Sequence, residues 1–230
     1  AALLLAFALP AAAQTIPGAA PAYTDRQPTA IANSDAVDRR FWAPGLDDGY
    51  VPQGITLAPD GAVLVSAYRS TDPKVGGGPA RIWVVDPATG AIRGQFDLPA
   101  PFAHAGGIAM GGEGKLWVAD TRLVGRFDLA RALAAGGLVE AERTWPLAPP
   151  LRGSFLSRHG GHLWIGGWNP DAEGRIFAVP ESALDGTEAL DERHAARSFA
   201  IPSRAQGAAF DPSCALWITR SSSRIGELLK

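Results

Sequence analysis

One short pattern recurs four times at nearly equal spacing, and it constrains the fold more than any other feature. The copies are GAVLVS (61–66), GKLWVA (114–119), GHLWIG (161–166) and CALWIT (214–219), and three of them place Trp at the centre of an apolar triplet. Seven residues before each copy stands an anchor residue: Gly54, Gly107, Ser154 and Gly207, which lie 53, 47 and 53 residues apart. A repeat of this length is typical of a four-stranded propeller blade.

Two further apolar runs follow within each repeat. The first set is RIWVVD (81–86), LVGRFD (123–128), RIFAVP (175–180) and RIGELL (224–229), and the second set is GQFDLP (94–99), RTWPLA (143–148) and RSFAIP (197–202). Turn signals separate the runs, as in Asp60-Gly61 and in DPATG at 86–90. Short runs of this kind indicate an all-β chain, so we predict blades whose strands a, b, c and d follow one another from each anchor.

Two segments between strands c and d depart from the strand pattern. Asp128 followed by LARALAA and Gly136 predicts a short capped helix, and PESALDGTEALDER at 180–193 predicts a polar, partly helical insertion. The large residue at the centre of strand b is expected to fill the space between neighbouring blades. This position is held by Leu64, Trp117, Trp164 and Trp217.

The fold prediction is therefore an all-β β-propeller of four-stranded blades, with about four blades visible. The fourth repeat lacks a strand d, and this leaves two interpretations. DRRFWAP at 38–44 resembles a strand d and would complete the last blade, which removes an exposed sheet edge. Alternatively the chain is a fragment of a larger, five- or six-bladed ring that continues past Lys230. We favour the second, because the sequence also begins without Met.

The N-terminal residues are typical of a segment for export. An apolar run from Ala1 to Leu9 precedes Ala11–Ala13, a small-residue cleavage pattern, and it is too short to span a bilayer. We expect a partial signal peptide at 1–13, a flexible linker at 14–34 and a propeller domain at 35–230 that is incomplete at its C-terminus. The alternative for the first segment is a helix packed on the domain. The expected location is a bacterial periplasm or the secreted fraction.

Charge and cysteine content exclude several classes of function. The formal net charge is -2, with 21 basic and 23 acidic residues, which provides no footprint for nucleic acid or an anionic membrane. Cys214 is the single cysteine, so an internal disulfide and a multi-cysteine metal site are excluded. We expect a monomer without a nucleic-acid partner and without a transmembrane span.

Propeller topology places the d-to-a and b-to-c loops on one face around the central opening, where a ligand would bind. Arginines from several blades suit a carboxylate or phosphate, because guanidinium offers a rigid fork of donors. The prediction is a small anionic ligand or a protein or peptide partner; the alternative is that these arginines are merely solvated. The candidate ligand-binding residues are Gln53, Tyr68, Arg69, His104, Asp120, Arg122, Arg152, Trp168, Asn169, Gln206 and Arg220.

Three local motifs are interpreted as turns rather than sites. HGGH at 159–162 would lie at an a-to-b hairpin without a third metal ligand, and GGEGK at 111–115 lacks the Ser or Thr of a phosphate loop. The segment from Asn169 imitates the start of a calcium loop but has Pro180 at the position of the required Glu.

PQGITLAPDG at 52–61 and GGIAMGGEG at 106–114, each followed by an LWV-type strand, resemble the NHL-repeat and gluconolactonase (senescence-marker protein) group of propellers. The resemblance covers roughly residues 48–230. It implies a catalytic divalent cation, usually calcium, in the central opening, with Asn or Asp often directly before the anchor. The residues at those places here are Gln53, Gly106, Gly153 and Gln206, and none is a carboxylate.

Two functional hypotheses follow. Calcium prefers six to eight oxygen ligands that include carboxylates, so we expect an exported propeller that binds its ligand without turnover and needs no cofactor. The alternative is a calcium- or zinc-dependent lactonase or hydrolase, in which the cation polarises a carbonyl and His104 is the candidate base. Asp47, Asp48 and Asp120 would then supply acids.

Overall fold

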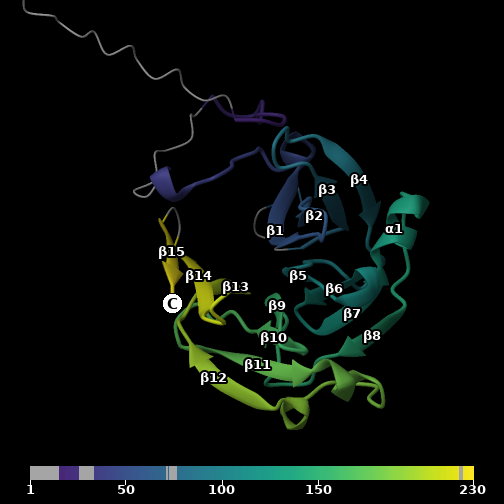
Figure 1. Cartoon of the computed structure of the whole chain (residues 1–230), viewed down its shortest axis with the longest axis vertical. Coiled ribbons are helices and arrows are strands. Elements are labelled where there is room, and N and C mark those ends of the chain that lie inside the picture. The colour runs from purple at the N-terminus through teal and green to yellow at the C-terminus, as the bar shows by residue number, and fades with distance from the viewer. Residues whose placement is uncertain (1–15, 26–33, 71, 73–76, 223–224) are drawn as a thin grey trace, which may run out of the picture.

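The computed structural model describes residues 16–25, 34–70, 72, 77–222 and 225–230. Four antiparallel sheets are arranged in a ring around a central axis and form a four-bladed β-propeller (Figure 1). This confirms the predicted fold class. The predicted signal peptide at 1–13 lies outside the described residues, and so does part of the predicted linker at 14–34.

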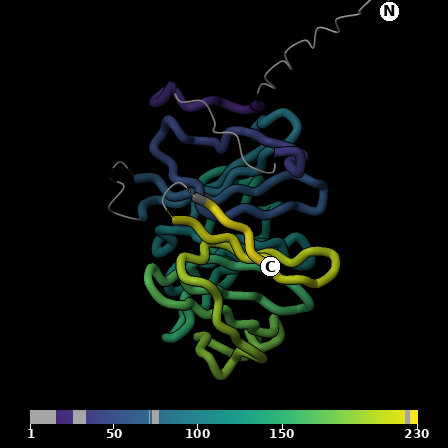
Figure 2. Tube along the Cα trace, turned by 90° about the vertical axis from the view of Figure 1, so that its left-hand side faces the viewer, coloured from purple at the N-terminus to yellow at the C-terminus, as the bar shows by residue number. Residues whose placement is uncertain are grey.

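Each sheet takes its strands in chain order, with the first strand nearest the axis. In a side view the fourth sheet lies between the first and the third (Figure 2). The strands of the first sheet are β1 (Tyr50–Leu57), β2 (Val63–Arg69), β3 (Ala80–Val85) and β4 (Ile92–Asp97). Those of the second are β5 (Gly107–Met110), β6 (Lys115–Asp120), β7 (Leu123–Asp128) and β8 (Arg143–Pro146). Those of the third are β9 (Phe155–His159), β10 (His162–Gly166), β11 (Gly174–Pro180) and β12 (Arg197–Ile201). Those of the fourth are β13 (Ala205–Phe210), β14 (Leu216–Ser222) and β15 (Ile225–Leu229).

The helices are short and lie outside the sheets. The predicted capped helix is α1 (Leu129–Ala135): the Asp128 side chain accepts a hydrogen bond from the Arg131 N–H, and Gly136 ends the helix with a φ of 66°. The predicted polar insertion contains the 3-10 helices η4 (Glu181–Leu184) and η5 (Glu192–His194). Three more 3-10 turns are η1 (Ser34–Ala36), η2 (Leu46–Asp48) and η3 (Gly112–Gly114).

The core consists of the seams between neighbouring sheets. We call the face that a sheet turns toward the next sheet its trailing face, and the opposite one its leading face. Leu64 is fully buried on the first trailing face, Trp117 packs in one cluster with Leu156 of the third sheet, and the Trp164 ring lies 4.9 Å from that of Phe210. The central residues of strand b therefore fill the space between blades at these three seams.

The anchor residues are small because the inner strands approach each other closely. A Cβ added to Gly107 would lie 2.1 Å from the backbone nitrogen of Leu156, and one added to Gly54 would lie 2.7 Å from the Ser66 Oγ. That hydroxyl also accepts a 2.9 Å hydrogen bond from the Gly54 N–H and donates one of 2.8 Å to the Ala105 carbonyl. A side chain at Gly107 would force the second and third sheets apart, and one at Gly54 would displace the Ser66 hydroxyl from these bonds.

The alternative in which residues 38–44 form the closing strand is wrong. This segment contains no strand, and the fourth sheet has three strands among the described residues. Instead, Phe41 packs against the apolar cluster around Trp83 on the leading face of the first sheet, and the Trp42 N–H donates a 2.8 Å hydrogen bond to the Pro17 carbonyl. The aromatic residues that resembled a strand therefore cover a sheet face.

Candidate functional site

The loops predicted to carry the site join into a continuous surface over three sheets. The Gly153 N–H donates to the Thr121 carbonyl at 3.2 Å, and the Trp168 N–H donates to the Ser154 Oγ at 2.9 Å. The Arg204 N–H donates to the Asn169 carbonyl at 2.7 Å. We call this surface, made of residues 121–122, 152–154, 167–171 and 204, the rim.

Two guanidinium groups of the rim lack partners. Arg122 and Arg152 are exposed, and neither side chain takes part in a hydrogen bond or ion pair within the described chain. A Cβ on Gly167 would lie 3.4 Å from the Arg152 Cβ, which places Arg152 beside the loop that carries Trp168. The Trp168 side chain is 39% exposed. The rim therefore offers free cationic donors next to an exposed aromatic surface.

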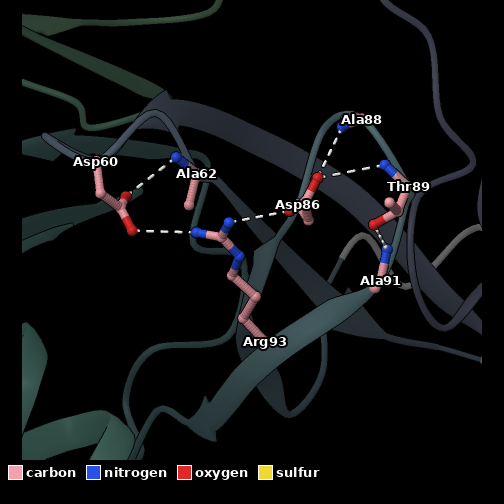
Figure 3. Close-up of polar contacts among 7 residues, drawn as sticks. All are labelled: Asp60, Ala62, Asp86, Ala88, Thr89, Ala91 and Arg93. Atoms are coloured by element: carbon pink, nitrogen blue, oxygen red, sulfur yellow. Dashed lines mark hydrogen bonds and ion pairs between the residues drawn. The ribbon is translucent and has the colours of Figure 1, made fainter.

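On the opposite face, which carries the a-to-b and c-to-d turns, Arg93 and Lys115 form ion pairs with neighbouring carboxylates. Figure 3 shows Arg93 between two carboxylates, at 3.1 Å from Asp60 and 2.9 Å from Asp86. Lys115 likewise contacts Glu142 at 2.6 Å, and the Glu142 hydrogen bond raises the pKa of Lys115 above its usual value. Neighbouring carboxylates neutralise Arg93 and Lys115, whereas Arg122 and Arg152 of the rim have no such neighbour within the described chain.

Asp120 has a structural role in positioning the loop that carries His104. Its carboxylate is 6% exposed. One oxygen accepts hydrogen bonds from the N–H groups of Ala103, His104 and Ala105, at 2.9, 2.7 and 2.8 Å, and the other accepts one from Thr121 at 2.6 Å. Both oxygens therefore already accept hydrogen bonds from the backbone. The predicted contact of Asp120 with a ligand stays a prediction.

Asp120→Asn is expected to lower the free energy of unfolding by about 1.5–3 kcal/mol. The amide removes the negative charge and replaces one acceptor oxygen with an NH2 donor, so that a backbone N–H group loses its acceptor. The melting temperature should fall by about 3–12 °C at 2–4 °C per kcal/mol, as measured by calorimetry. Asp171→Asn, an exposed carboxylate of the rim, is the control and should change stability by less than about 0.5 kcal/mol. Equal effects would show that Asp120 does not hold the loop.

Tyr68 and His104 form a stacked pair beside the rim. Their ring centroids are 5.0 Å apart with an interplanar angle of 27°. Tyr68 is buried and His104 is half-buried. The stack joins the end of β2 to the loop held by Asp120, so these two predicted site residues do lie together.

Arg69 and Asn169, two more predicted site residues, form hydrogen bonds with nearby backbone groups. The Arg69 Nε donates to the Asp48 carbonyl at 2.9 Å, which ties β2 to η2. The Asn169 Oδ1 accepts the N–H groups of Asp171 and Ala172 at 3.1 and 3.0 Å, which is a side-chain turn. The segment from Asn169 is therefore a polar loop, as the sequence predicted, and it begins with a side-chain turn.

Arg204 is a rim residue that the sequence analysis missed. It has a φ of 62°, a left-handed conformation that side chains other than Gly rarely adopt. Its Nε donates to the Pro170 carbonyl at 2.9 Å and its Nη1 to the Ser222 Oγ at 2.6 Å. Arg204 stands three residues before its anchor, as His104 does, and this shared repeat position was the signal available in the sequence.

Arg204 and Arg220 line one pocket of about 310 Å³, together with Ser203, Ser221 and Ser222. Arg220 also pairs with Glu227, and this hydrogen bond raises the pKa of Arg220 and lowers that of Glu227. Arg220 is therefore compensated, unlike Arg122 and Arg152.

Gln53 and Gln206 line a second cavity of about 190 Å³, which is bounded by the inner strands of all four sheets and by β14 and β15. The Gln53 amide nitrogen donates to its neighbour's carbonyl, that of Pro52, at 3.0 Å. The residues here do not fit a calcium ion, which needs carboxylate oxygens. In the described ranges no three His, Cys, Asp or Glu side chains gather closely enough to hold a metal.

The HGGH motif forms the hairpin between β9 and β10. Gly160 and Gly161 have positive φ values of 58° and 72°. His159 stacks on Phe210 at 4.3 Å, and the His162 Nδ1 lies 2.7 Å from the Gly160 carbonyl oxygen. The two imidazoles serve the turn and the neighbouring seam.

Comparison with known proteins supports the fold. No protein-family model matches the chain, and no curated protein sequence matches it. A luciferin-regenerating enzyme of solved structure is similar with a TM-score of 0.53 and 16% identity, over 77% of this chain and 56% of that one. Virginiamycin B lyase from Staphylococcus aureus is similar with a TM-score of 0.41 and 19% identity, over 83% of this chain and 58% of that one. The chain thus spans little more than half the length of these β-propeller proteins.

In its described part, no helix has the length and apolar character of a membrane span.

Proposed function

We propose that the rim binds a small anionic molecule that bears carboxylate groups. The observation that carries this proposal is the pair of exposed, unpaired guanidinium groups of Arg122 and Arg152 on hydrogen-bonded loops of two adjacent sheets. A guanidinium binds a carboxylate through two parallel hydrogen bonds, and such charge-assisted bonds are about twice as strong as neutral ones.

Neighbouring groups support the same ligand class. The exposed Trp168 indole offers an apolar surface beside the cations, and the Tyr68–His104 stack lies on the adjacent loops. Asp171 and Glu173, both exposed, are the acids of the β10–β11 loop, and they favour a small ligand over an extended polyanion. The absence of a large basic excess points the same way.

Citrate is the probe for this proposal, with binding measured by calorimetry at low ionic strength. The Arg122→Ala/Arg152→Ala variant should bind citrate at least about tenfold more weakly than the unaltered protein, which corresponds to about 1.4 kcal/mol. The attraction should also weaken with added salt, because exposed charges are screened.

Arg131→Ala/Arg197→Ala is the matched control, because it removes two exposed arginines that lie away from the rim and whose side chains make no hydrogen bond or ion pair within the described chain. It should bind citrate like the unaltered protein. Equal weakening in both variants would reduce the effect to overall charge, and no citrate binding by the unaltered protein would overturn the proposal.

The metal-dependent lactonase suggested by the gluconolactonase resemblance gains no support from the described residues. Both carboxylate oxygens of Asp120 accept hydrogen bonds from backbone N–H groups, and the residue before each anchor is Gln or Gly. His104 is stacked on Tyr68 beside the rim, which suits a contact with a bound ligand. We therefore propose binding as the function of this face.

A further inference from the structure

The seam between the fourth and first sheets differs from the other three. Figure 1 shows β14 and β15 separated from β1, and residues of all three strands line the central cavity of about 190 Å³. Large apolar side chains on both sides face solvent: Ile55 is 67% exposed, Leu57 65% and Leu228 60%. We call this region the open seam.

The repeat identifies what such residues do elsewhere in the ring. On the leading faces, Ile108 and Leu156 have the same partner position on strand b as Ile55, and they are only 2% and 5% exposed. On the trailing faces, Trp117 and Trp164 occupy the position of Trp217 and are 3% and 6% exposed. Trp217 is only partly buried and lines the cavity. A neighbouring sheet covers each of these positions at the three closed seams.

The open seam also contains an unfinished sheet. In each of the first three sheets the third strand pairs with a fourth, whereas no other described strand pairs with the far edge of β15. An unpaired edge next to exposed apolar residues is a template for further strand pairing.

We propose that the open seam is an intramolecular docking surface, and that a further unit of the same repeat, contributed by the same polypeptide, occupies it. One apolar face of the added part covers Trp217 and Leu228, and one of its strands pairs with β15. The last sheet of the completed ring packs on the first sheet and covers Ile55 and Leu57.

Two other occupants fit less well. The first and fourth sheets as they stand do not cover this seam, because Ile55, Leu57 and Leu228 remain exposed. A second copy, placed head to tail, would cover the apolar faces through its own leading and trailing sides. It would still bring no fourth strand to β15, because each copy lacks that strand within its described residues.

Two variants test the proposal in two proteins: residues 1–230 alone and the product of the complete gene. Ile55→Asp should lower the melting temperature of the complete product by at least about 5 °C, because a buried carboxylate is costly. In residues 1–230 alone the same change should cost less than about 2 °C, because Ile55 is exposed there. Ile92→Asp is the control in both, since Ile92 is 53% exposed on the outer strand β4.

Hydrogen exchange of β15 provides a second measurement. Its amides should exchange more slowly in the complete product than in residues 1–230 alone, whereas those of β10 should be protected equally in both. A mild effect of Ile55→Asp in the complete product, or equal exchange of β15, would overturn the proposal. A concentration-dependent dimer of residues 1–230 with a protected β15 would assign the seam to a second copy and would overturn it as well.

Discussion

Trp164→Ala is expected to lower the free energy of unfolding by about 3–5 kcal/mol, the usual cost of truncating a buried aromatic side chain. The side chain is 6% exposed, and its ring centroid lies 5.5 Å from that of Phe199 and 4.9 Å from that of Phe210. Its Nε1 also donates to the His159 carbonyl at 3.3 Å. The melting temperature should fall by about 6–20 °C at 2–4 °C per kcal/mol, as measured by circular dichroism.

Trp217→Ala in residues 1–230 is the matched control, because Trp217 holds the same repeat position at the open seam. Its Nε1 donates to Asp211 at 2.8 Å, and hydrogen bonds from Ser213 and Trp217 hold the pKa of that carboxyl well below its usual value. Trp217 is only partly buried, so its loss should cost less than half as much as the loss of Trp164. If both substitutions lowered the free energy of unfolding equally, burial between two sheets at a closed seam would not explain the contribution of Trp164.

Gly107→Ala is expected to cost about 3 kcal/mol or more, at the upper end for an overpacked core. The added Cβ would lie 2.1 Å from the Leu156 nitrogen and 2.6 Å from the Phe155 carbonyl carbon, and neither backbone atom can rotate away. The second and third sheets must therefore separate along their inner strands. Urea unfolding would show this as a lower midpoint with a nearly unchanged slope.

Gly186→Ala separates this steric effect from the general effect of replacing glycine. No atom lies within 4 Å of a Cβ placed there, and Gly186 is outside the sheets. Its replacement should leave stability within about 0.5 kcal/mol. If Gly107→Ala were equally mild, close approach of the inner strands would not explain the small anchors.

Much of the fold could be predicted from the sequence because the repeat displays the same packing problem several times. Trp117 and Trp164 recur at one position, since each must fill the same space between sheets. Asp128 and Gly136 marked α1 because capping depends on residues a few positions apart. The false strand at 38–44 failed for the opposite reason: Phe41 and Trp42 have the character of strand residues, but distant partners decide which surface they cover.

The candidate site could be predicted only in part. Repeat numbering placed Arg122 and Arg220 at the same end of the ring, yet the structure leaves the first free and pairs the second with Glu227. Which guanidinium is neutralised depends on contacts that no local pattern reveals. The same holds for Asp120, whose carboxylate caps a loop fifteen to seventeen residues earlier in the chain. Arg204 shares the repeat position of His104, but its backbone conformation has no signature in the sequence.

The chain-ordered pairing within each sheet has a consequence for biogenesis. Every hydrogen-bonded strand neighbour within the described sheets comes from the same consecutive stretch, and the anchors of these stretches lie 53, 47 and 53 residues apart. Synthesis proceeds at about 5–20 residues per second, so each stretch has several seconds to complete its own hairpins before the next emerges from the ribosome. The first three sheets therefore need no strand from a later part of the chain to form, and their pairing order allows each to assemble as it is translated.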